Sequence, residues 1–122
     1  MSANALTSAY TFLLNNARLL ERRLFEHLFL GAPPEPALWA LLAYRNPDGG
    51  FGNALEPDKR TASSQPIDQE FALHVLDDLG WEAAVAAHVC DFLLTITTPD
   101  GGVPVVLPTV RDAPRAPWWN TE

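Results

Sequence analysis

The chain has 122 residues, which is enough for one small domain or for part of a larger one. A hydrophobic fraction of 48% and an aromatic fraction of 10% supply a core and argue against disorder. The formal net charge of −7 excludes a nucleic-acid partner, because binding a phosphate backbone requires a basic face.

Targeting features point to the cytoplasm. No segment approaches the roughly 20 consecutive apolar residues of a membrane span, so none is expected. The first ten residues contain no basic residue and do not resemble a secretory signal. The single cysteine, Cys90, cannot form an internal disulfide and suits a reducing compartment.

The first expected element is a long helix over about 5–30. Gly31, Pro33 and Pro34 end it. Apolar residues at spacings of three and four form a stripe along this helix: Leu6, Tyr10, Leu13, Ala17, Leu20, Leu24 and Leu28. Five more apolar residues widen the stripe: Phe12, Leu14, Leu19, Phe25 and Phe29. The helix should therefore pack against more than one neighbour, and another chain is one candidate.

A short second helix is expected over about 35–44, followed by a turn and a polar loop. Asn46-Pro47 opens the turn, Asp48 can accept backbone N–H bonds, and the glycines that follow tolerate positive φ. If Gly50 has positive φ, replacing it by valine should destabilise the fold by roughly 1–3 kcal/mol.

Two more helices complete the pattern. Ser63 or Ser64 can cap a third helix over about 66–79, which has Pro66 near its first position. A fourth helix is expected over about 81–96. The remaining residues, 105–122, should form an irregular, proline-rich tail without a long helix.

The turn after the second helix recurs after the fourth. Pro47-Asp48-Gly49-Gly50 matches Pro99-Asp100-Gly101-Gly102, which begins 52 residues later. A period of this length with two helices per unit is typical of helical repeats, although two unrelated turns would give the same letters. The expected fold is therefore all-α, with about two helix pairs in residues 1–104. The residues assigned to the structural turns are Asp48, Gly49, Gly50, Gly52, Asp100, Gly101 and Gly102.

The sequence Asp-Gly-Gly-Phe-Gly at 48–52, with its degenerate copy at 100–103, resembles the repeat of the α/α-toroid proteins. These include the terpenoid cyclases and the β subunits of protein prenyltransferases. The resemblance covers about residues 35–104, and Trp118-Trp119 resembles the tail of a longer bacterial cyclase-like group. A toroid needs about five to seven helix pairs. The resemblance therefore implies an incomplete toroid, which is either an N-terminal piece of a longer protein or part of a homo-oligomer.

The resemblance implies an apolar isoprenoid ligand. Aromatic side chains would line its cavity, because their faces stabilise cations, and this chain alone is expected to be inactive. The alternative is a non-catalytic helical module that binds a partner or self-assembles through its first helix. No nucleophile constellation, phosphate loop or metal cluster favours an enzyme, and no cofactor or metal is expected. The candidate lining residues are Trp39, Phe51, Phe71, Trp81 and Phe92.

The catalytic and zinc-binding motifs of the related proteins are incomplete in this sequence. The related cyclases protonate their substrate with Asp-X-Asp-Asp, whereas residues 75–78 read Val-Leu-Asp-Asp. The related prenyltransferases bind zinc through Asp, Cys and His. His88, Cys90 and Asp91 are too closely spaced to share one helix face. Cys90 is therefore expected to be a small core residue.

The remaining catalytic candidates are His74 and Asp78, and the acids Glu56, Asp58 and Asp68. His74 and Asp78 have i,i+4 spacing, which suits an acid–base pair or an ordinary surface pair. Acids beside a dry cavity could have raised pKa values and donate protons. In the alternative structural role, Arg60 bridges Glu56 or Asp58. A neighbouring guanidinium lowers a carboxyl pKa, and this favours the structural role.

Overall fold

The computed structural model describes residues 2–120 and confirms an all-α chain. Within that range there are five α-helices, two short 3₁₀ helices and no strand, only two isolated β-bridges. The contacts divide the chain into two compact units, one ending at Ala43 and the other beginning at Tyr44.

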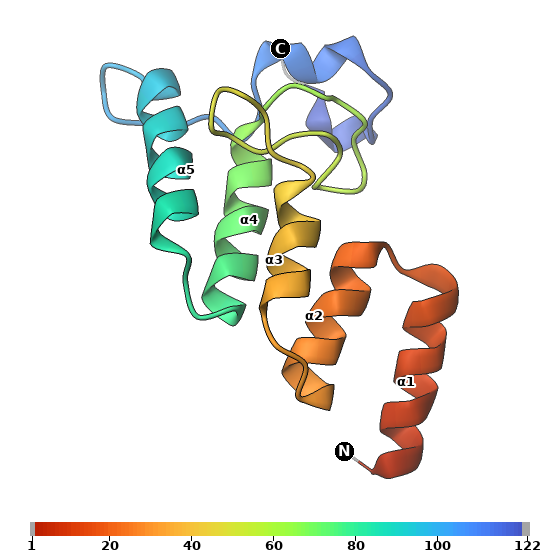
Figure 1. The fold of residues 1–122 in the computed structure, drawn as a ribbon. Coiled ribbons are helices and arrows are strands. Elements are labelled where there is room, and N and C mark those ends of the chain that lie inside the picture. The colour runs from red at the N-terminus through yellow and green to blue at the C-terminus, as the bar shows by residue number, and fades with distance from the viewer. Residues whose placement is uncertain (1, 121–122) are drawn as a thin grey trace. The chain divides into compact units, whose positions relative to one another are not determined.

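The first unit contains three helices, α1 (Ala3–Asn16), α2 (Leu19–Leu30) and α3 (Glu35–Leu42). Consecutive helices lie side by side and run antiparallel (Figure 1). Gly31 ends α2 with a φ of 74°, as the sequence predicts, and Pro34 precedes the first residue of α3. The buried side chains come from α2 and α3 and are Leu20, Phe25, Ala37, Ala40 and Leu41.

The single long helix expected over 5–30 is wrong, because the chain bends at Ala17 and Arg18, both of which are extended. The backbone N–H of Ala17 still bonds to the carbonyl of Leu13, at 2.9 Å. Arg18 forms an ion pair with Glu21 in the first turn of α2.

The periodic stripe survives the bend because its two halves face each other. Tyr10 of α1 stacks on Phe25 of α2 with ring centroids 5.5 Å apart. The Tyr10 hydroxyl also donates a hydrogen bond to Glu26, at 2.6 Å. One helix and a bent helical hairpin therefore have the same hydrophobic spacing, and the spacing alone does not separate them.

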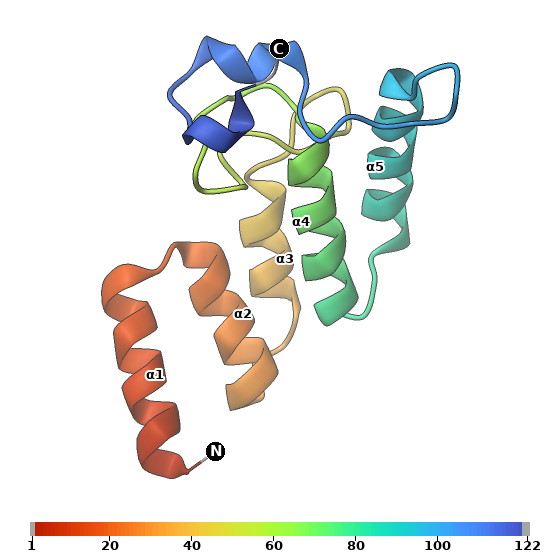
Figure 2. The ribbon, with the colours of Figure 1, turned by 180° about the vertical axis from the view of Figure 1, so that it is seen from behind.

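The second unit is built on the antiparallel pair α4 (Pro66–Asp78) and α5 (Ala83–Ile96), seen from behind in Figure 2. Both helices agree with the sequence prediction to within two residues. The predicted serine cap is wrong, because Gln65 precedes α4 and makes no side-chain cap bond. The Ser64 hydroxyl instead donates to Asp48, at 2.8 Å. The helices bury Ala72, Val75, Leu76, Val85, Val89 and Phe92.

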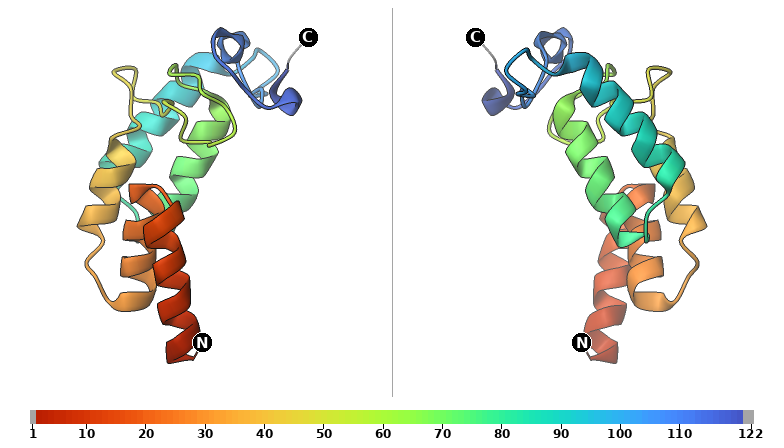
Figure 3. Two further views of the ribbon diagram at one scale, coloured as in Figure 1. Left: turned by 90° about the vertical axis from the view of Figure 1, so that its right-hand side faces the viewer. Right: turned by 90° about the vertical axis from the view of Figure 1, so that its left-hand side faces the viewer.

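The tail packs on the loop that precedes α4 (Figure 3). It contains two short 3₁₀ helices, η1 (Pro108–Asp112) and η2 (Pro117–Trp119). Backbone N–H groups of Arg60 and Ile67 donate to the carbonyls of Pro114 and Val105, at 2.9 and 3.0 Å. The Thr61 hydroxyl donates to the carbonyl of Val110. The tail up to Asn120 is therefore an integral part of the second unit.

The two Pro-Asp-Gly-Gly turns have the same backbone hydrogen bonds. In the first, the N–H of Gly49 donates to the carbonyl of Asn46, and the N–H of Asn46 donates to the carbonyl of Gly50. Thr98, Gly101 and Gly102 repeat this pattern. Gly49 and Gly101 have φ values of 84° and 87°, as expected for a type I turn that ends in a glycine bulge.

Candidate functional site

A groove of about 500 Å³ lies in the second unit. Pro66, Ile67 and Leu73 of α4 line it together with Leu93 of α5 and the segment 103–105, which is Val-Pro-Val. This volume falls in the range of small-molecule sites, which are mostly apolar and carry few polar groups. The groove is therefore the candidate binding site.

Three polar side chains, all from α4, also line the groove: Gln69, Glu70 and His74. Gln69 is buried and serves the fold. Its amide accepts from the N–H of Phe51 at 2.8 Å and donates to the carbonyls of Phe51 and Gln65 at 2.7 Å. Glu70 and His74 are exposed, which makes them accessible to a ligand.

The acidic loop is organised around a buried ion pair. Lys59 Nζ lies 2.5 Å from Asp68 Oδ2, and both side chains are fully buried. The other carboxylate oxygen of Asp68 accepts the backbone N–H of Glu56 at 2.8 Å. Breaking a buried pair of this kind typically costs several kcal/mol, because it leaves an uncompensated charge. Asp68 therefore fixes the loop on α4.

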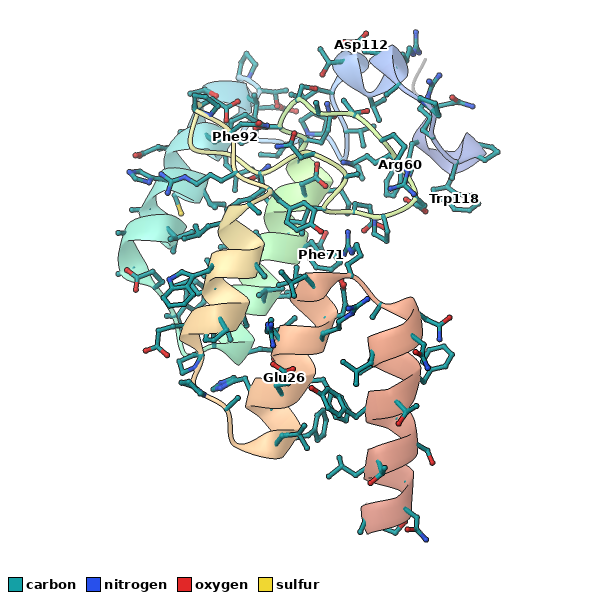
Figure 4. The ribbon with its side chains drawn as sticks, turned by 45° about the vertical axis from the view of Figure 1, so that its right-hand side comes forward. Glu26, Arg60, Phe71, Phe92, Asp112 and Trp118 are labelled. Atoms are coloured by element: carbon teal, nitrogen blue, oxygen red, sulfur yellow. The ribbon has the colours of Figure 1, made fainter. Side chains whose placement is uncertain are left out.

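Asp58 joins the loop to the tail. Its carboxylate accepts hydrogen bonds from the indole N–H groups of Trp118, at 2.8 Å, and Trp119. The backbone N–H of Ala116 donates to the carbonyl of Asp58, also at 2.8 Å. Figure 4 labels Trp118 on the tail and Arg60 on the loop. The partners of Asp58 are thus tryptophans, in place of the Arg60 that the sequence suggested.

Glu56 is the acid with a perturbed protonation equilibrium. Burial raises the pKa of its carboxyl, and the nearby Asp58 and Asp68 carboxylates raise it further, whereas Lys59 lowers it. The structure therefore reverses the direction expected from Arg60. Glu56 does not line the groove, so its raised pKa provides no acid there.

The two remaining catalytic candidates, His74 and Asp78, both lie on α4. His74 lines the groove, but Asp78, the last residue of α4, does not. Cys90 is exposed, so the core position expected for it is wrong. No group of three or more metal-ligating side chains occurs within residues 2–120.

None of the aromatic candidates lines the groove. Phe51 is fully buried and Phe92 nearly so, which makes them core residues of the second unit. Phe71 is partly exposed on α4, Trp81 is exposed between α4 and α5, and Trp39 is exposed on α3. Trp81 also has a φ of 67°, a strained value for a bulky residue.

The sequence did not reveal the groove, because aliphatic side chains distant in sequence line it. Glu70 could have been found, since it lies four residues before His74 and therefore shares its helix face. What was missing was the approach of 103–105 to α4, which the hydrogen bond from Ile67 to Val105 fixes.

Comparison with profiles of known families, with curated proteins and with solved structures finds no match to this chain. No helix within residues 2–120 combines the length and apolar character needed to cross a bilayer.

Proposed function

We propose that the chain binds an apolar isoprenoid in the groove between α4, α5 and residues 103–105, and that it does not transform this ligand by itself. The observation that carries the proposal is the groove, with its largely aliphatic lining and a volume of about 500 Å³. The binding of an elongated hydrocarbon chain becomes more favourable in proportion to the apolar surface that such a lining removes from water.

Binding without turnover follows from the positions of the acids. A cyclase that protonates a hydrocarbon needs a carboxylic acid that stays protonated beside its substrate. Asp58 of the loop and Asp68 of α4 hold the loop through Trp118 and Lys59, and Glu56 lies outside the groove lining. A toroid-like chain of this kind would then provide a binding surface rather than a complete active site.

Adjacent leucines provide a matched test of the binding site. Leu93 lines the groove, whereas Leu94 is 72% exposed and does not. We expect Leu93→Ser to weaken the binding of a C15 isoprenoid at least tenfold and Leu94→Ser to leave it unchanged, as measured by isothermal titration calorimetry. Equal effects of the two substitutions would contradict the groove as the site.

Turnover is tested separately. Incubating the chain with squalene and with prenyl diphosphates, followed by mass spectrometry, should return only unchanged substrate. A cyclised product that disappears in Asp58→Asn would show that the loop is catalytic and that the chain is complete as an enzyme.

A second function, self-assembly, is favoured by one observation in the first unit. Several large apolar side chains there are at least two-fifths exposed, and such surfaces commonly mark interfaces. They come from α1 and α2 and are Phe12, Leu14, Leu19, Leu28, Phe29 and Leu30.

A further inference from the structure

We infer that the ligand of the groove is an apolar chain that ends in a hydroxyl group, and that Glu70 and His74 hold this hydroxyl. The inference rests on the proposed binding function and specifies the polar end of the ligand. It is carried by the only two exposed polar side chains among the residues that line the groove.

Glu70 and His74 can act on one ligand atom. Both belong to α4 and are four residues apart, so their Cβ atoms lie roughly 6 Å from each other on one helix face. A group placed between two such side chains can reach both. Neither side chain forms a hydrogen bond or ion pair with another side chain of residues 2–120, so both are available to a ligand.

A hydroxyl matches the two groups chemically. It has one O–H donor and two acceptor lone pairs. The ionised carboxylate of Glu70 accepts only, and an imidazole has an N–H to donate in either charge state. The hydroxyl oxygen can therefore donate to Glu70 and accept from His74 at the same time, while the carbon chain lies on Ile67, Leu73 and Leu93.

The charges of the groove disfavour a diphosphate. No lysine or arginine is among its lining residues, and Glu70 adds a negative charge. The chain as a whole has a formal charge of −7. Proteins hold diphosphates with Arg, Lys or a metal ion, and a carboxylate next to one is repulsive. A pure hydrocarbon would bury the aliphatic lining but form no hydrogen bond with Glu70 or His74.

Three probes with the same C15 chain test the inference by calorimetry: farnesol, its methyl ether and farnesyl diphosphate. The ether lacks the O–H donor but retains the oxygen. We expect farnesol to bind about tenfold more tightly than the ether, and the diphosphate to bind more weakly than farnesol. Glu70→Gln should reduce the affinity for farnesol while leaving that for the ether nearly unchanged, because only farnesol has an O–H to donate. His74→Ala should reduce the affinity for both, because both retain the oxygen that accepts from His74.

Asp77→Asn is the control variant, because Asp77 is exposed on the same helix but does not line the groove. It should bind all three probes as the unmodified chain does. Equal affinities for farnesol and the ether, or tighter binding of the diphosphate, would overturn the hydroxyl inference and leave the binding function standing. Failure of all three probes to bind would overturn both.

Discussion

At the scale of single residues, Gly50 and Gly102 occupy the same place in the two matching turns but have different surroundings. A Cβ on Gly50 would lie 2.8 Å from the ring of Phe92 and 2.9 Å from Ser64. A Cβ on Gly102 would meet the Thr98 hydroxyl at 3.1 Å. Positive φ occurs at Gly49 and not at Gly50, so the sequence-based reason for a cost of replacing Gly50 does not apply. The constraint at Gly50 is close packing.

We therefore predict that Gly50→Ala destabilises the chain by roughly 1–3 kcal/mol, through overpacking against Phe92 and Ser64. Gly102→Ala should cost less than about 1 kcal/mol, because an exposed threonine side chain can move. Thermal melts followed by circular dichroism compare the two. Similar losses in melting temperature would refute the packing explanation.

Glu56 leads to a prediction about pH. Because burial and nearby carboxylates raise its pKa, the folded chain binds this proton more tightly than the unfolded chain. Its stabilising contribution is present below the ordinary pKa of 4.5 and is lost as the pH rises through the raised value. At neutral pH the ionised side chain therefore lowers the stability of the fold.

Glu56→Gln should consequently raise the melting temperature at pH 7, and this gain should shrink as the pH falls towards 4.5. Glu70→Gln is the matched control, because it makes the same change at an exposed site of the ligand-free chain. A gain in Glu56→Gln that is independent of pH would show that removing the charge is not its cause.

At the scale of elements, the helices were more predictable than the loops. α4 and α5 have clear apolar periodicity and end at glycine or proline signals, so their bounds follow from local rules. The apolar spacing does not predict the bend at Ala17, because the two halves of the stripe face each other and so keep the periodicity of one helix. The pairing of Lys59 with Asp68 and of Asp58 with two tryptophans depends on tertiary contacts, which periodicity does not encode.

The tail is the element whose docking depends most on one side chain. Asp58→Asn removes one of the two oxygens that accept from Trp118 and Trp119, together with the charge. We expect a loss of about 1–3 kcal/mol and faster hydrogen exchange at the tail amides, among them Ala116. Asp112→Asn, an exposed change within the tail itself, should alter neither quantity. Unchanged exchange in Asp58→Asn would mean that the tail is held by other contacts.

At the scale of the whole molecule, the sequence predicts the helical class because hydrophobic spacing and composition are properties of the entire chain. The toroid arrangement, by contrast, concerns how helix pairs stack on further pairs, and it stays a prediction. The two turns with matching hydrogen bonds are compatible with a repeat. A shared turn is a local feature, however, and does not specify how many units follow it.

The last prediction concerns assembly, which involves the first unit. Helix α1 has no buried residue and no charged one, and Phe12 on it is 64% exposed. In a chain with a net charge of −7, an uncharged helix is where two copies can approach with the least repulsion. We expect the chain to be oligomeric in light scattering and Phe12→Asp to shift it towards monomer. Thr11→Asp, which adds the same charge at the neighbouring exposed position, should shift it less. A cooperative monomer in the unmodified chain would refute self-assembly, and equal shifts in both variants would assign the effect to charge rather than to the Phe12 ring.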